Sequence, residues 1–331
     1  DYPDSLRIPC IGAEMIWKSG EHDEAAEIFA SIEEKEEFAV VEKYLAYYAY
    51  EKGNQREAED YVAKVLRQNY QEEEFLEFVN RLDKERIELA KKKTPENADE
   101  AKRYVIACIR TENYKIGLEF LKNSRFLEEL IGGYGYLCHF YLKEEKWKKA
   151  RESAVTWRER LSEKKDEEDI NKKVAQSWNY QAEAAYGMAK IPKEEEIPEE
   201  KKQALLKERA YWLREAEQAL REAIAYHEQD MFVQLHTFLL DVQMDAETYE
   251  AAKKTADEIL DVYPNFFMVL SKKQKICYEL REAQEVIDIF YQAQDIYLNF
   301  EGRDILEEYI AGFYDLATAV FIHYQQYEDA A

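Results

Sequence analysis

Small and apolar residues recur at helical spacing along this chain, and the clearest example lies just before Pro264. The run begins at Tyr249, continues with Ala252 and Ala256, and ends at Ile259. Spacings of three and four residues place side chains on one face of a helix, and a following proline cannot continue that helix. The pattern therefore predicts an amphipathic helix that stops before the proline.

Helices of the same kind recur at intervals that cluster near 33 to 36 residues. One begins at His22, just after Gly20, and the next begins at Gln55, just after Gly53. Intervals of this length are typical of stacked helical hairpins, because a single hairpin cannot bury its apolar face alone. The other predicted starts of second helices are Tyr114, Trp147, Leu213, Tyr249, the weaker Ala283 and an incomplete one at Tyr327.

A small residue stands in most second helices at the point where the two helices of a hairpin have to approach closely. A larger side chain there would force the pair apart, so we expect close helix-to-helix contacts at these positions. They are Ala25, Ala58, Ala150, Ala216 and Ala252.

The first helix of the hairpin that contains Trp147 carries Tyr134, Leu137, Cys138 and Tyr141. Together with the alanine-bearing second helices, this pattern resembles the tetratricopeptide repeat (TPR) family, whose repeat is degenerate. The resemblance covers most of the chain. It implies an all-α fold, a right-handed superhelical solenoid of antiparallel helix pairs, with about seven repeats and a partial one at the C-terminal side. We expect residues 1–331 to form this single array.

The interval between Gln55 and Tyr114 is 59 residues, longer than one repeat. An amphipathic stretch at 72–93 accounts for the excess and is interpreted as an extra helix, which ends before Pro95. In the alternative interpretation, this helix is the front half of a repeat whose back half spans 98–110.

The interval between Trp147 and Leu213 is 66 residues. It contains an acidic loop bracketed by Pro192 and Pro198, with long helical stretches on both sides. These features predict one enlarged repeat, and a hinge at 190–200 is the open alternative.

The composition leaves little room for strands and their turns. The 331 residues include only 10 Gly and 6 Pro, whereas 46% are hydrophobic and 35% are charged, so most of the chain has to be helix. The net charge of −24 opposes binding to nucleic acid and to anionic membranes, because both require clustered Lys and Arg. The same charge suits a basic partner surface, and the alternative is that acidic outer faces only keep the solenoid in solution. No apolar run reaches 18 residues, so we expect no membrane insertion.

Four cysteines lie far apart in the sequence, each among apolar neighbours: Cys10, Cys108, Cys138 and Cys277. We therefore expect buried free thiols, which suit a cytoplasmic location. The chain begins at Asp1 without a methionine, so an exported form stays open.

The sequence offers no set of residues arranged for catalysis. The five histidines lack the spacing of a zinc-binding helix. Cys138 and His139 are neighbours on a predicted helix and point about 100° apart, so they cannot form a nucleophile–base pair. The glycines at 132, 133 and 135 lack the lysine and the preceding strand of a phosphate loop and predict a close turn. We expect no enzyme, no cofactor and no metal, and an active site inside a helical toroid is the weakest hypothesis.

By the TPR resemblance, the first helices line a concave groove, and their exposed residues are the candidate contacts for a partner. These are Lys43, Tyr47, Tyr50, Lys102, Arg110, His139, Lys143, Gln234, Thr237 and Asp241. Tyr and Arg are favoured as interface anchors, although a tyrosine is equally suited to packing inside the superhelix.

TPR proteins that hold the C-terminal carboxylates of heat-shock chaperones use a clamp of two Lys and two Asn on successive first helices. Lys43 matches one lysine, but Tyr47 stands at the first Asn position. In the next unit Lys102 is followed by Ile106 at the equivalent place. The clamp is absent, which argues against a co-chaperone of this kind.

The leading hypothesis is a protein–protein interaction scaffold that binds a peptide or helix of a partner in its groove. The alternative is a sensor or docking segment of a larger regulator or enzyme whose effector domain lies outside these residues. The incomplete last repeat motivates this alternative.

Overall fold

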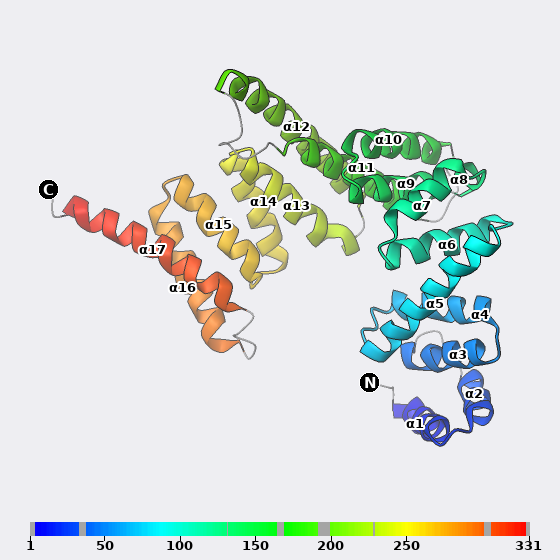
Figure 1. The fold of residues 1–331 in the computed structure, drawn as a ribbon. Coiled ribbons are helices and arrows are strands. Elements are labelled where there is room, and N and C mark those ends of the chain that lie inside the picture. Colours follow the sequence, from blue (N-terminus) through cyan, green and yellow to red (C-terminus); the bar gives the residue numbers. More distant parts are fainter. Residues whose placement is uncertain are drawn as a thin grey trace. The chain divides into compact units, whose positions relative to one another are not determined.

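The computed structural model describes residues 4–32, 38–130, 132–163, 169–190, 199–227, 229–300 and 306–328. Every regular element in these ranges is a helix, and consecutive helices fold back on each other (Figure 1). The chain divides into two compact units, Asp1–Gly117 and Leu118–Ala331. The predicted all-α class is confirmed, and consecutive helices pair into hairpins inside each unit.

Unit 1 is built from three helical hairpins. Its helices are α1 Asp4–Lys18, α2 His22–Ser31, α3 Ala39–Glu51, α4 Gln55–Arg67, α5 Glu73–Lys92 and α6 Ala98–Arg110. The hairpins are α1/α2, α3/α4 and α5/α6, with α2 packed on α3 and α4 on α5. Helix α7 (Tyr114–Asn123) contains the boundary between the two units.

Helix α5 occupies the amphipathic stretch 72–93, and its main contacts are with α6. This pairing makes α5 the first helix and α6 the second helix of one hairpin, as in the alternative interpretation of the long interval. The side chain of Asn97 accepts a hydrogen bond from the backbone N–H of Glu100, which explains why α6 begins at this point. Lys102 and Arg110, expected on a first helix, therefore lie on a second helix.

The described part of unit 2 contains four complete hairpins and two further α-helices, the short α8 and α17. The helices are α8 Phe126–Glu129, α9 Gly133–Lys143, α10 Trp147–Ser162, α11 Ile170–Met188, α12 Glu199–Tyr226, α13 Phe232–Asp245, α14 Tyr249–Val262, α15 Phe267–Glu279, α16 Ala283–Asn299 and α17 Glu307–Glu328. The pairs are α9/α10, α11/α12, α13/α14 and α15/α16, and α17 packs on α15 and α16. The described residues thus hold seven hairpins, and α17 takes the place of the predicted partial repeat.

One turn geometry recurs between helices and sets where the following helix starts. A left-handed residue stands two positions before each of six helices, at Gly20, Gly53, Glu112, Glu145, Glu247 and Arg281. The next N–H then donates to a carbonyl five residues back, as from Asn54 to Ala49 at 2.8 Å. This is the Schellman ending of a helix, which satisfies carbonyl groups that the last turn would leave unpaired.

Most predicted helix starts are confirmed. His22, Gln55, Trp147, Tyr249 and Ala283 are each the first residue of a second helix. Tyr114 is likewise the first residue of a helix, α7.

Two predicted starts are wrong. Leu213 lies inside α12, because residues 199–213 contain no Gly or Pro that would end a helix before it. Tyr327 lies in the last turn of α17 rather than at the start of a helix. Residues 329–331, and 191–198 of the predicted hinge at 190–200, lie outside the described residues.

The small residues predicted at helix-to-helix contacts are buried in five of the hairpins. Ala25, Ala58, Ala150, Ala216 and Ala252 are all completely buried. The Cys138 thiol reaches across a hairpin to donate to the carbonyl of Ala150 at 2.9 Å. A Cβ atom at Gly135 would lie 2.8 Å from the ring of Trp157, so this glycine allows a close approach rather than a turn.

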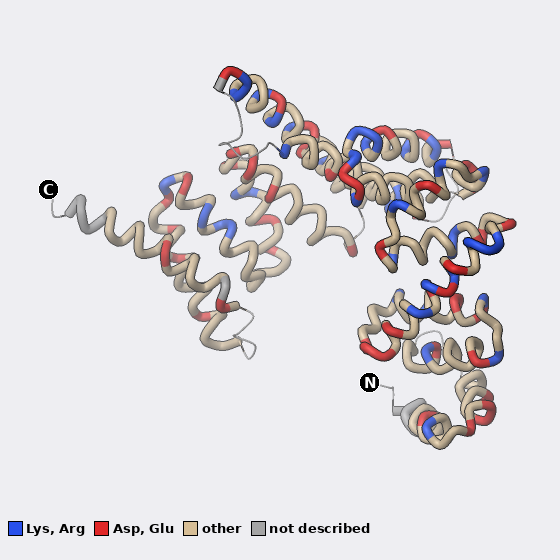
Figure 2. Tube along the Cα trace, in the orientation of Figure 1, with Lys and Arg blue, Asp and Glu red and all other residues tan. Residues whose placement is uncertain are grey.

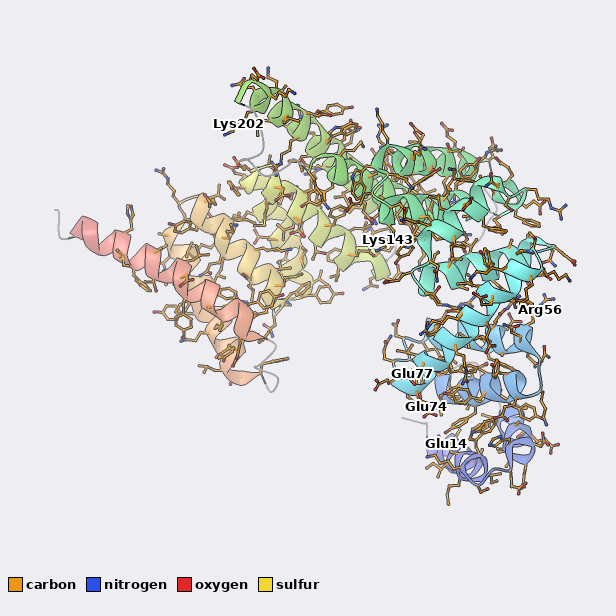
Figure 3. The ribbon with its side chains drawn as sticks, in the orientation of Figure 1. Glu14, Arg56, Glu74, Glu77, Lys143 and Lys202 are labelled. Atoms are coloured by element: carbon orange, nitrogen blue, oxygen red, sulfur yellow. The ribbon has the colours of Figure 1, made fainter. Side chains whose placement is uncertain are left out.

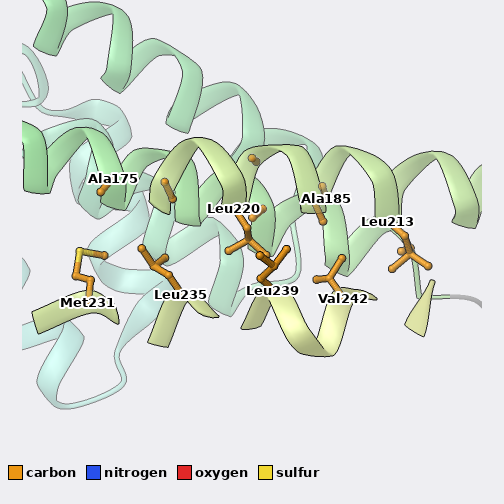
Figure 4. Packing of buried hydrophobic residues seen from close by; sticks show 13 residues of the cluster. Ala175, Ala185, Leu213, Leu220, Met231, Leu235, Leu239 and Val242 are labelled. Atoms are coloured by element: carbon orange, nitrogen blue, oxygen red, sulfur yellow. The ribbon is translucent and has the colours of Figure 1, made fainter. Parts of the chain in front are cut away.

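One buried cluster of unit 2 extends across three consecutive helices. Figure 4 shows Ala175 and Ala185 of α11, Leu220 of α12, and Leu235 and Leu239 of α13 meeting in one cluster. Acidic and basic residues are interspersed along the helices of each unit (Figure 2). Within the described ranges, no helix combines the length and the apolar character needed to cross a bilayer.

All four cysteines are buried and unpaired, as predicted. Burial raises the pKa of the Cys108 thiol to about 11, an effect partly opposed by the hydrogen bond with Tyr104. Such thiols are protonated and unreactive at neutral pH. The cytoplasmic location stays a prediction.

Candidate functional site

The first helices of unit 1 line a hollow of about 700 Å³, which we call the unit 1 groove. Its walls are the aromatic rings of four residues from α1, α3 and α5: Trp17, Tyr47, Tyr50 and Phe78. Its charged side chains are Glu51, Glu74, Glu77 and Arg81. Three carboxylates therefore face one guanidinium around an aromatic wall.

The first helices of unit 2 line a second hollow of about 550 Å³, the unit 2 groove. Helices α9, α11 and α13 supply most of its lining, and Trp147 adds its ring from the start of α10. The polar lining side chains are His139, Lys143, Gln176, Asn179, Tyr180, Glu183, Tyr186, Lys190 and Gln234. Leu142, Met231 and Phe238 are apolar members of the lining.

Five of the residues predicted as partner contacts line one of these grooves. Tyr47 and Tyr50 lie in the unit 1 groove, and His139, Lys143 and Gln234 lie in the unit 2 groove. Their role as partner contacts stays a prediction.

Four other predicted contacts use their polar atoms inside the fold. Lys43 is buried and reaches Glu72 at 2.6 Å, and Arg110 binds both carboxylate oxygens of Asp83 at 2.6 and 2.7 Å. Asp241 accepts from Lys272 at 2.5 Å. The Thr237 hydroxyl donates to the carbonyl of Val233 at 2.6 Å.

Lys102, the remaining predicted contact, is exposed on α6 and lines neither groove. Its place on a second helix follows from the pairing of α5 with α6. Like that of the other nine residues, its role as a partner contact stays a prediction.

Asn179 is a buried polar residue in the lining of the unit 2 groove. Only 3% of its surface is exposed, and its side-chain N–H donates to Glu183 Oε1 at 2.7 Å. Its carbonyl oxygen Oδ1 is buried and has no hydrogen-bond partner within the described residues. Leaving a buried acceptor unpaired costs roughly 1–3 kcal/mol, so a donor from outside would recover that cost.

The lining of the unit 2 groove also carries the carboxyl group of Glu183 and the ammonium groups of Lys143 and Lys190. Burial raises the pKa of Glu183, and the hydrogen bond from Asn179 and the charge of Lys143 lower it in part. Lys143 and Gln234 are exposed at the rim, and Lys190 places its Nζ 5.5 Å from the centre of the Trp147 ring.

Gly187 determines how close Trp147 lies to α11. A Cβ atom on Gly187 would lie 2.5 Å from the Trp147 ring. At that distance any other residue would force the ring to move. The glycine thus allows the indole to form one wall of the unit 2 groove.

Helix α11 supplies much of the polar lining of this groove, and sequence reasoning missed it. Gln176, Asn179, Glu183 and Gly187 recur at three- and four-residue spacing, so they share one helix face. That polar and small stripe was visible in the sequence. It lies in the long interval where the repeat could not be followed, so nothing marked α11 as a first helix.

Three side chains lie close together as in a metal site, but their carboxylates form ion pairs with lysines. Cys277, Glu282 and Glu285 present ligand atoms close together. Lys253 Nζ lies 2.6 Å from both Glu282 and Glu285, and Lys273 reaches Glu285 at 3.0 Å. The ammonium groups supply the positive charge that these carboxylates need.

No protein-family model and no curated protein sequence matches the chain. Solved structures that match include the TPR2AB domain of yeast Sti1 in its pHSP90 complex, with 14% identity over 85% of this chain and 99% of that one, and a TM-score of 0.28. The human IFIT1 dimer with PPP-AAAA matches with 12% identity, coverages of 93% and 88%, and a TM-score of 0.35. The TPR domain of P58(IPK) matches with 14% identity, coverages of 93% and 87%, and a TM-score of 0.27. At these values the likenesses add nothing to the all-α fold of helical hairpins that the chain itself shows.

Proposed function

We propose that this protein is an interaction scaffold that holds a peptide segment of a partner protein in the unit 2 groove. The observation that carries the proposal is Asn179, which lines the groove and whose buried Oδ1 has no hydrogen-bond partner in the described residues. A peptide backbone presents one N–H donor and one C=O acceptor per residue. An asparagine amide, with both an acceptor and donors, matches these two groups.

The remaining lining favours a peptide over a small polar molecule. Gln176 and Gln234 add further amides on α11 and α13, so backbone groups can be met at several points along a segment. Leu142 and Phe238 provide apolar contact area for side chains of the segment. A mixture of apolar contact and a few placed polar groups is typical of ligand grooves.

The charged side chains of the unit 2 groove indicate which kind of peptide segment it favours. Lys143 and Lys190 are exposed at the rim, whereas the one carboxylate of the lining, Glu183, already accepts from Asn179. A segment that carries an acidic side chain would meet both ammonium groups. The net charge of −24 disfavours nucleic acid as the ligand.

The proposal includes no catalytic step. The Cys138 thiol donates to the Ala150 carbonyl, and burial raises its pKa, so a thiolate nucleophile next to His139 is disfavoured. A role as a docking segment of a larger regulator stays a prediction from the sequence.

A peptide library displayed on phage, selected against the full chain, tests the proposal. We expect selected peptides to bind Asn179→Ala about tenfold more weakly than the unmodified protein, because hydrogen bonds worth about 1.4 kcal/mol are lost. Ser177→Ala is the matched control: Ser177 is buried on the same helix, donates its hydroxyl to the Val174 carbonyl, and does not line the groove. Its thermal unfolding midpoint and peptide affinity should match those of the unmodified protein. Equal binding to Asn179→Ala and to the unmodified protein would remove the groove assignment.

A further inference from the structure

The aromatic wall of the unit 1 groove is rigidly packed. The Phe78 ring meets Tyr47 edge-on with centroids 4.8 Å apart, and Tyr50 edge-on at 5.4 Å. Trp17 follows at 6.4 Å from Tyr47. Contacts of this kind fix the ring orientations before any ligand arrives.

The same rings already accept a guanidinium. The Arg81 side chain lies 5.4 Å from the centre of the Tyr50 ring and 5.6 Å from that of Phe78. A cation at this distance is attracted to the negative face of an aromatic ring. Arg81 is exposed, so its hold on the wall is open to competition from solvent and from another cation.

Two carboxylates beside this wall are uncommitted. Glu74 and Glu77 are exposed and make no ion pair or hydrogen bond within the described part of the chain. Both lie on α5, on the same side of unit 1 in Figure 3. Glu51, the third carboxylate, accepts from His22 at 2.8 Å. The groove therefore has more negative charge than its own residues neutralise.

Carboxylates near the aromatic wall affect the pKa of one of its rings, Tyr47. Burial raises the pKa of Tyr47, and the charges of Glu74 and Glu72 raise it further, because a phenolate would be repelled. The Tyr47 hydroxyl is buried without a hydrogen-bond partner among the described residues, so its oxygen can accept from a cationic N–H group.

We propose that the unit 1 groove binds a basic peptide segment of a partner protein, seating an arginine side chain between the aromatic wall and the carboxylates of Glu74 and Glu77. Arginine suits this place better than lysine, because its planar guanidinium stacks on a ring face and still offers N–H groups to carboxylates. This surface lies in a different unit from the unit 2 groove and has the opposite charge, so the inference goes beyond the proposed function.

Fluorescence anisotropy with the full chain and short labelled peptides tests the inference. The probes are a Gly-Ser peptide with three spaced arginines, and the same peptide with citrulline, which keeps the shape and removes the charge. We expect the arginine peptide to bind and the citrulline peptide to show no binding. Affinity should fall as salt is raised. Equal binding of the two peptides, or no binding of the arginine peptide at low salt, would overturn the inference.

Paired double variants separate the groove from general attraction to an acidic protein. Glu74→Gln with Glu77→Gln should weaken the arginine peptide about tenfold, as two exposed charge contacts are lost. Glu73→Gln with Glu88→Gln removes the same charge from the same helix outside the groove and should change affinity less than about twofold. Equal weakening by both pairs would overturn the site. Asn179→Ala should leave the arginine peptide unaffected, so failure of this inference and failure of the proposed function are distinguishable.

Discussion

The first helices of unit 1 and unit 2 occupy equivalent places in their hairpins, yet the hollows they line differ in charge and in wall. In the unit 1 groove, packed rings stand beside two carboxylates, Glu74 and Glu77, that form no ion pair with the residues that the structure describes. In the unit 2 groove, the carboxylate of Glu183 is held by Asn179, and the exposed charges are Lys143 and Lys190. The repeat sets the backbone, whereas the lining side chains determine which ligand charge each groove favours.

The largest expected effect comes from Gly187→Ala in the unit 2 groove. The added methyl group meets the Trp147 ring at 2.5 Å, so the indole has to move. Overpacking of this kind costs about 1–3 kcal/mol of unfolding free energy. Thermal unfolding followed by circular dichroism should show the loss, and peptides selected for the unit 2 groove should bind weakly.

Gly312→Ala is the control for that variant, because a Cβ atom there meets nothing within 4 Å. Alanine in an open helical position should raise stability by up to about 1 kcal/mol. If both glycine variants behave alike, the close approach of Trp147 does not shape the groove.

The second-largest effect is expected from charge reversal in the unit 2 groove. Lys143→Glu with Lys190→Glu should weaken the selected peptides about tenfold or more, since attraction to an acidic residue becomes repulsion. The arginine peptide should bind as before, because it uses the unit 1 groove. Lys148→Glu with Lys254→Glu makes the same charge change at exposed positions that line neither groove. Comparable weakening by this control pair would mean that net charge, not the groove, governs binding.

Two of the left-handed turns, one held by glycine and one by glutamate, differ in a way that stability can test. Gly53 holds a left-handed turn in unit 1 with φ of 75°, whereas Glu247 holds the equivalent turn of unit 2 with φ of 57°. Gly53→Ala should lower the unfolding free energy by about 1 kcal/mol, because a Cβ atom is strained in this conformation. Glu247→Gly should raise it by a smaller amount, roughly 0.5–1 kcal/mol. Chemical unfolding curves measure both, and a stabilising Gly53→Ala would contradict the turn geometry.

Removing Arg81 tests whether its guanidinium competes with the arginine peptide for the ring faces of the unit 1 groove. Arg81→Gln vacates the faces of Tyr50 and Phe78 and removes the only positive charge in the lining that the structure describes. The arginine peptide should therefore bind about threefold more tightly in anisotropy measurements, since the internal cation no longer competes. Arg67→Gln, at the end of α4, is a control that keeps the lining intact. Weaker binding to Arg81→Gln would contradict competition for the ring faces.

The smallest effect concerns the pH dependence of unit 2. The folded-state pKa of Glu183 is raised by burial, so its ionised form lowers stability at neutral pH. As the pH falls from 7 through the raised pKa, Glu183 takes up a proton and the unmodified protein gains stability relative to Glu183→Gln. The gain is complete below the pKa of an unfolded glutamate, about 4.3. Urea unfolding at pH 7 and pH 5 measures the difference, and a relative loss of stability on acidification would contradict the direction of this shift.

Local sequence carried most of the fold. His22, Gln55, Trp147, Tyr249 and Ala283 were identified as helix starts because the preceding turn, the small residue and the apolar stripe all lie within about ten neighbouring residues. The prediction of a helix start at Leu213 was wrong because nothing in the preceding residues ends a helix. Helix α12 begins at Glu199 instead. Backbone hydrogen bonds in helices and Schellman turns link residues only a few positions apart, so local patterns contain the information that specifies them.

The candidate sites depended on contacts that local patterns do not specify. Lys43 pairs with Glu72, Arg110 with Asp83, and Asp241 with Lys272, over separations of 29, 27 and 31 residues. The first and third of these ion pairs join neighbouring hairpins, whereas Arg110 and Asp83 join the two helices of one hairpin. Each uses a side chain that the sequence alone suggested for a partner. By itself the sequence determined the helices, their turns and the buried alanines. Only the tertiary structure decided that the α11 face joins α9 and α13 around Asn179, because the stacking of hairpins brings together side chains a full repeat apart.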